Sequence, residues 1–119
     1  MIRIRLALAS ACALALVIAA PSGAATTKLV ATVGPGFTIT LTKGGKKVTS
    51  LKPGAYAITV NDKSTFHNFH LKGPGVNKST SVAFKGTPKK AWMVTLKRGT
   101  YTYVCDPHAA QMKGSFRVR

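Results

Sequence analysis

The feature that most restricts the fold of this chain is the close spacing of turn signals along residues 26–119. Breaks rich in glycine, proline and lysine interrupt the sequence at 34–36, 43–46, 52–54 and 73–75. Such residues supply the backbone freedom or the preset φ that tight turns need. The short segments between the breaks alternate apolar and polar side chains, and no segment has a convincing helical pattern. We therefore expect an all-β sandwich.

Nine segments are expected to form strands. They are Lys28 to Val33, Phe37 to Thr42, Lys47 to Leu51, Ala55 to Asn61, His67 to Lys72, Thr80 to Phe84, Ala91 to Lys97, Thr100 to Cys105 and Ser115 to Val118. Side chains alternate between the two faces of a strand. Tyr101, Tyr103 and Cys105 therefore share one face, which we expect to point inward. By the usual preference of aromatic residues in strands, four phenylalanines are expected in the core: Phe37, Phe69, Phe84 and Phe116.

The first 25 residues have the layout of a secretory signal peptide. Arg3 and Arg5 precede an apolar run over 6–20, and small residues follow, with cleavage expected after Ala24 or Ala25. Because the apolar run is shorter than the roughly 20 residues that span a bilayer, we favour removal over retention as a membrane anchor. We expect export to the periplasm, the cell envelope or the exterior, and one domain over 26–119.

Removal of residues 1–25 leaves Cys105 without a partner for a disulfide. In an oxidising compartment an unpaired thiol needs an explanation, and one explanation is a buried cysteine that acts as a small apolar side chain. However, His108 and Met112 follow in the same short loop. Thiolate, imidazole and thioether together are the donors of a copper site, whereas a zinc site would use more cysteine or histidine and would not select methionine.

A second imidazole is available from His67 or His70. These histidines are three residues apart, so in a strand they point to opposite faces and cannot both bind one ion without distortion. One of them would complete a His₂Cys trigonal site with a long axial methionine, the arrangement of blue-copper electron-transfer centres. Met93, by contrast, alternates with Trp92 and Val94 and is expected to be a packing residue.

The ligand loop carries a family resemblance. The stretch from Gly99 to Cys105, followed by His108, Met112 and Gly114, resembles the cupredoxins, and most closely the plastocyanin, pseudoazurin and amicyanin group. His67-Asn68-Phe69 adds to this resemblance, which extends from about Lys28 to Arg119. It implies a Greek-key β-sandwich over 26–119 with one type 1 copper ion. The ligands that it implies are His67, Cys105, His108 and Met112.

The resemblance also assigns roles to residues around the ligands. It selects His67 over His70 because asparagine follows the ligand histidine in the family, and it leaves His70 as a solvent-facing strand residue. Asn68 would hydrogen-bond the residue after the cysteine, which is usually serine or threonine and here is Asp106. His108 would be the partly exposed ligand, and its small apolar neighbours suit a flat docking patch. These neighbours are Pro107, Ala109 and Ala110.

Charge narrows the choice of partners. The chain has 18 Lys plus Arg against 2 Asp plus Glu, and without Arg3 and Arg5 its net charge is +14. Such a surface favours acidic proteins, nucleic acid or anionic envelope polymers. Nucleic acid is the weaker interpretation, because the basic residues are scattered over turns and are not interleaved with exposed aromatics.

These observations favour a small monomeric electron carrier that cycles between Cu(I) and Cu(II). We expect redox partners with acidic docking surfaces, because Lys72 and Lys113 border the ligand segments, and we also consider association with an anionic envelope surface. With only Asp62 and Asp106 as carboxylates, no nucleophile, base and orienting group can be assembled, so an enzyme is not expected. The alternative is a copper-binding or copper-delivery module of the envelope.

Overall fold

The structure is a computed structural model that describes residues 15–16 and 25–119. Apart from residues 15, 16 and 25, the expected signal peptide lies outside the described residues. Within the described part of the chain, no helix has both the length and the apolar character needed to cross a membrane.

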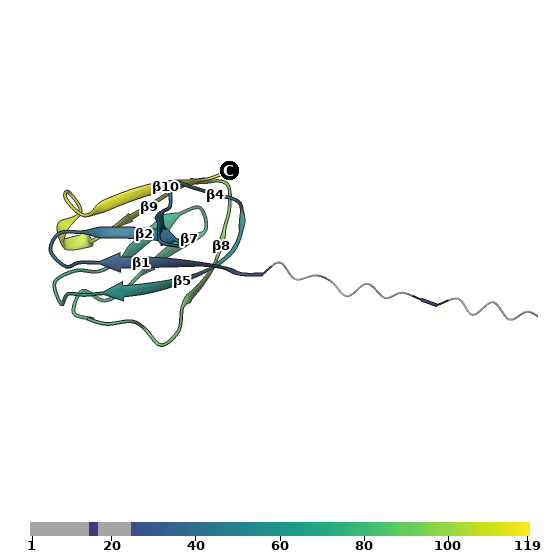
Figure 1. Ribbon diagram of the computed structural model, residues 1–119. Helices are drawn as coiled ribbons and strands as arrows, with labels where there is room; N and C mark the ends of the chain where they lie inside the picture. The colour runs from purple at the N-terminus through teal and green to yellow at the C-terminus, as the bar shows by residue number, and fades with distance from the viewer. Residues whose placement is uncertain (1–14, 17–24) are drawn as a thin grey trace, which may run out of the picture.

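The described domain consists of two packed sheets, which confirms the expected all-β sandwich (Figure 1). One sheet has the strand order β3 (Lys46–Lys47), β2 (Ile39–Lys43), β1 (Thr27–Val33), β5 (Gly54–Asp62) and β8 (Trp92–Leu96). The other has the order β4 (Ser50–Leu51), β10 (Lys113–Val118), β9 (Gly99–Val104), β6 (His70–Gly73) and β7 (Val76–Ser79). Both sheets are mixed, because β1 pairs with β5 and β4 pairs with β10 in parallel, while the other pairs are antiparallel.

Alternation along the strands builds the core between the sheets. Tyr101, Tyr103 and Cys105 are all buried, as the period of two predicts. The Tyr101 ring stacks on Phe116 with centroids 5.3 Å apart, and the Tyr103 ring stacks on Phe69 at 5.4 Å. Both phenylalanines therefore lie in the core as expected, and their aromatic packing holds β9 between β10 and β6.

Three of the expected packing residues are instead exposed. Phe37 is 59% exposed and Phe84 is 37% exposed, because each lies in a connection between strands and not in a strand. Met93 alternates with Val94 as expected, but its side chain points to the solvent side of β8 and is 64% exposed. The rule that aromatic residues in strands are buried failed at Phe37 and Phe84 because the expected strand boundaries there were wrong.

Besides the strand expected from Phe37, three expected strands differ from the observed ones. Lys47 to Leu51 is not one strand, because the chain crosses there from β3 in one sheet to β4 in the other. Thr80 to Phe84 is not a strand; β7 lies earlier, where the turn after β6 brings the chain straight back into an antiparallel hairpin. The segment from His67 to Lys72 becomes a strand only at His70, so His67 lies in the preceding connection.

The connection between β9 and β10 closes one end of the sandwich. It contains the 3₁₀ helix η1 (Asp106–His108), and it is closed by the Cys105 amide, which donates to the Met112 carbonyl at 3.0 Å. Gly114 follows at the start of β10, where a Cβ atom would overlap the Tyr103 ring, so only glycine lets that ring pack across the strand. The start of β1 and the C-terminus lie at the opposite end of the domain (Figure 1), where Ala25 and Arg119 line one surface hollow.

Candidate metal centre

Three donor atoms from two connections converge at this end of the sandwich. The Nδ1 atoms of His67 and His108 are 3.1 Å apart, and the Cys105 Sγ lies 3.6 Å from each of them. The point equidistant from the three atoms is about 2.0 Å from each, close to the ~2.0–2.3 Å at which imidazole nitrogen and thiolate sulfur bind Zn²⁺, another first-row ion. The three residues therefore fit a single metal ion in a trigonal arrangement.

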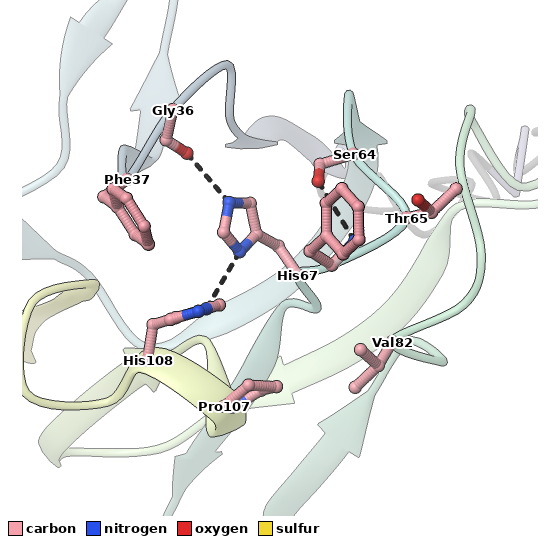
Figure 2. Close-up of a pocket in the computed structure, with 9 residues that line it drawn as sticks. Gly36, Phe37, Ser64, Thr65, His67, Val82, Pro107 and His108 are labelled. Carbon is pink, nitrogen blue, oxygen red and sulfur yellow. Dashed lines mark hydrogen bonds between the residues drawn. The ribbon is translucent and has the colours of Figure 1, made fainter.

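A backbone carbonyl orients the His67 ring. The His67 Nε2 lies 2.8 Å from the Gly36 carbonyl oxygen, which can only accept, so Nε2 carries the proton and donates. In the neutral ring, Nδ1 then presents its lone pair toward the His108 ring (Figure 2). The Cys105 Sγ lies on the same side of His67. A hydrogen bond from the ring nitrogen that does not bind the metal is typical of metal-binding histidines, since it sets the tautomer and the ring orientation.

Met112, the expected fourth ligand, is fully buried at the end of the loop. Its amide donates to the His108 carbonyl at 2.8 Å, while its carbonyl accepts from Cys105. The loop is thus held in a compact turn, and the thioether belongs to the same buried cluster as Cys105. That His67, Cys105, His108 and Met112 bind the ion stays a prediction.

An apolar hollow of about 610 Å³ lies over the histidine side of the site (Figure 2). Phe37 packs against both rings, with its centroid 5.7 Å from that of His67 and 5.0 Å from that of His108. Of the three small residues expected in the docking patch, Pro107 lines the hollow, whereas Ala109 and Ala110 do not. Apart from Pro107 and the two histidines, no sequence pattern pointed to the residues that line it. The full lining is Gly36, Phe37, Ser64, Thr65, Phe66, His67, Val82, Pro107 and His108.

Asn68 and Asp106 clamp the two ligand segments together. The Asn68 Oδ1 accepts from the Asp106 amide at 2.8 Å, and the Asn68 Nδ2 donates to the Asp106 Oδ2 at 2.8 Å. These two bonds confirm the bridge that the resemblance implied, with a carboxylate in place of a hydroxyl. They join the connection that carries His67 to the loop that carries Cys105 and His108.

His70 extends this clamp, and the expectation that it faces solvent was wrong. Its side chain is 15% exposed, and its Nδ1 lies 2.8 Å from the Asp106 Oδ1. Its Nε2 lies 2.6 Å from the Asn77 Oδ1 on β7. The carboxylate of Asp106 gives the His70 ring a partner that the sequence pattern of β6 could not reveal.

The two carboxylates of the chain have opposite pKa shifts. At Asp106, partial burial raises the pKa, but hydrogen bonds from Asn68 and His70 and the nearby positive charges outweigh burial, so the pKa lies below its ordinary value. Asp106 is therefore ionised at neutral pH. At Asp62, burial raises the pKa above its ordinary value despite a hydrogen bond from the Ser64 amide and the influence of His67. Its Oδ2 is buried without a hydrogen-bond partner in the described structure.

A buried cysteine sulfur and two imidazoles at the end of a β-sandwich define the cupredoxin class of copper proteins. The chain matches the family model described as copper binding proteins, plastocyanin/azurin family, over residues 44–119. The protein belongs to this family, and its cofactor is copper. A search of curated proteins finds no match for the sequence.

Solved structures agree with this assignment. Rusticyanin from Thiobacillus ferrooxidans is 29% identical, with a TM-score of 0.52 over 79% of this chain and 77% of that protein. An oxidised mutant of amicyanin shares the fold at 20% identity and a TM-score of 0.50, over 77% of this chain and 82% of that one. A chain of a heme-copper terminal oxidase dimer shares the fold at 18% identity and a TM-score of 0.54. The match covers 77% of this chain, which spans 63% of the oxidase chain.

The charge of Asp106 gives a testable consequence for the reduction potential. We expect Asp106→Asn to raise the potential by tens of millivolts, because removal of a nearby negative charge disfavours the more positive cupric state. In a one-electron couple, 59 mV corresponds to about 1.4 kcal/mol, so even a screened charge is measurable by voltammetry.

The positive charge of Lys72 also acts on Asp106, so its removal should shift the reduction potential in the opposite direction. We expect Lys72→Gln to lower the potential, and by less, since the lysine is exposed. A fall in potential for Asp106→Asn, or no change, would contradict an ionised carboxylate acting on the metal.

Proposed function

We propose that this protein is an exported, monomeric electron carrier that binds one type 1 copper ion through His67, Cys105, His108 and Met112. Bound copper supplies a one-electron redox couple. The observation that carries the proposal is the asymmetric burial of the site: Cys105 and Met112 are 0% exposed, whereas His108 is only half-buried, beside an apolar hollow. Such a site admits electrons through one ligand edge while it excludes solvent from the others.

The protein's own contribution is a rigid set of donors. The Gly36 carbonyl holds the His67 ring, the Asn68 clamp joins the two ligand segments, and closure of the loop places Met112. Because these contacts do not involve the metal, the donors keep their positions in either oxidation state. Little rearrangement is then needed when an electron enters or leaves.

Burial also favours a carrier over the alternative of a copper-delivery module. Delivery requires ligands that an acceptor site can reach, yet His67 is 4% exposed and Cys105 is enclosed. An enzyme is disfavoured by the hollow itself, since its lining offers no titratable side chain other than the two histidines assigned to the metal.

Export is supported by the layout of residues 1–25 and can be checked by cell fractionation.

The test of this function is a redox titration of the purified protein with added Cu(II). We expect one copper per chain, intense visible colour and a reversible one-electron wave in voltammetry. A colourless complex, or a copper ion that is released on each reduction, would favour delivery over electron transfer.

We further propose that the redox partner presents an acidic surface to the end of the molecule that carries His108. Lys113 follows Met112 directly, and Lys63 precedes Ser64, which lines the hollow. Attraction between opposite charges accelerates encounter, and salt screens it over a Debye length of about 10 Å at 0.1 M ionic strength.

The bimolecular electron-transfer rate with an acidic redox protein should therefore fall as salt rises. We expect Lys113→Glu to slow the rate several-fold at low salt without a change in the copper spectrum. Lys47→Glu has the same charge change at the other end of the domain and should have the smaller effect. Stopped-flow measurements that show a salt-independent rate, or equal effects of the two variants, would contradict steering toward His108.

A further inference from the structure

The end of the sandwich opposite the metal centre carries a group of exposed lysines, which we call the basic end. It consists of Lys43, Lys46, Lys47 and Lys52. Lys43 and Lys46 face each other across the β2–β3 hairpin. Lys43 and Lys52 line one surface hollow, and Lys43, Lys46 and Lys47 line a second one beside it, with Ser50 and Leu51 common to both.

No acidic side chain neutralises this end. The chain has only two side-chain carboxylates, and both lie toward the metal. Asp62 is level with Val33 at the last position of β1, and Asp106 lies in the ligand loop. Within residues 25–119 the single ion pair is the one between His70 and Asp106. The terminal residue Arg119 lines the same hollow as Lys43 and Lys52, but no ion pair joins its carboxylate to these lysines in the described structure, so their positive charge is available to an external anion.

The course of the chain indicates which anionic partner this end meets. Ala25 lines the same hollow as Lys43 and Lys52, so residues 1–24 join the domain at the basic end. That segment contains the apolar run over 6–20, of the kind that enters a bilayer during export. The basic end is thus the part of the domain that is nearest to the membrane during export, before the expected removal of residues 1–25.

We propose that the basic end docks on the surface of a bilayer that contains anionic phospholipids. Lysines close to such a surface are attracted by its negative potential, and each strengthens binding by about fivefold. Nucleic acid is less favoured as the partner, because no exposed aromatic side chain accompanies the four lysines to stack on bases. The proposal assigns the expected association with the envelope to one surface, the basic end. Docking through this surface does not depend on copper.

Docking in this way leaves the metal centre accessible. The nine residues of β5 run from Gly54 at the basic end to Asp62 at the metal end, a length of about 26 Å at ~3.3 Å per residue. The His108 side of the site would therefore point away from the bilayer. A carrier held in this orientation could exchange electrons with soluble partners while it stays near the membrane.

The experiment is co-sedimentation of the full chain with vesicles of phosphatidylcholine, with or without phosphatidylglycerol. We expect the anionic vesicles to bind the protein more tightly than the neutral ones do. Binding to the neutral vesicles measures the contribution of the apolar run over 6–20. The triple variant Lys43→Gln, Lys46→Gln, Lys47→Gln should weaken this preference by up to roughly a hundredfold, given about fivefold per lysine.

The matched control removes three exposed lysines from the metal end: Lys63→Gln, Lys85→Gln, Lys113→Gln. It has the same net charge as the first variant and should lose less than about threefold, because screening confines the attraction to charges near the surface. Circular dichroism verifies that both variants remain folded. Equal losses in the two variants, or no preference for anionic vesicles, would overturn the proposal. Binding of soluble polyphosphate through the basic end, without binding of vesicles, would also overturn it.

Discussion

Replacement of Cys105 with serine is expected to remove essentially all of the intense visible absorption of the oxidised protein. This absorption arises from charge transfer between a thiolate and Cu(II), as the resemblance to blue-copper proteins implies. A serine hydroxyl occupies nearly the same volume but is a hard, protonated oxygen, so it cannot replace the soft sulfur donor. The measurement is the visible spectrum after addition of Cu(II).

A control is needed because Cys105 is completely buried in the core cluster. Burial of an unpaired hydroxyl costs about 1–3 kcal/mol, so the metal-free variant should still fold, with a lower free energy of unfolding. Met93→Leu changes an exposed sulfur outside the site and should leave the spectrum unchanged. If the colour survived in Cys105→Ser, the thiolate would not be its source.

The second large effect is expected at His67. His67→Ala should abolish the native spectrum, because it removes one of three donor atoms that lie within 4.8 Å of one another. His70→Ala removes the same ring three residues later and should leave the spectrum nearly intact. The His70 ring contacts Asp106 and Asn77 and has no contact with the Cys105 sulfur.

The hollow beside His67 allows a further check on this pair. Added imidazole can enter through the apolar opening next to Phe37 and should partly restore the colour of His67→Ala. The same treatment should have no effect on His70→Ala. Reversed phenotypes, with colour lost in His70→Ala and kept in His67→Ala, would show that the ligand assignment is wrong.

Most of the fold followed from local patterns. Glycine and proline breaks and the period of two predicted a sandwich and placed Tyr101, Tyr103 and Cys105 on an inner face. The errors in strand boundaries have one physical cause, which is that pairing between strands decides where a strand begins and ends. The expected strand over Thr80 to Phe84 failed because β7 pairs with β6 directly after the turn. Phe37 is exposed for a similar reason, since β2 begins only at Ile39.

The sequence alone determined the part of the site that is local. Cys105, His108 and Met112 lie within eight residues, so any closed loop between two strands brings them near one another, and their chemistry points to copper. Only the tertiary structure decided what meets this loop from elsewhere. His67 is 38 residues from Cys105, and the Gly36 carbonyl that orients its ring is 31 residues from His67.

The same distinction holds for charge. Composition alone determined that the protein is strongly basic, but strand order and the course of the connections decided that Asp62 and Asp106 lie toward the metal and Lys43, Lys46 and Lys47 lie away from it. The positions of these charges relative to the metal centre depend on how the two sheets pack, and long segments of chain separate the residues concerned. Periodicity reports only which side of a strand is buried, and it carries no information about which distant segment covers that side.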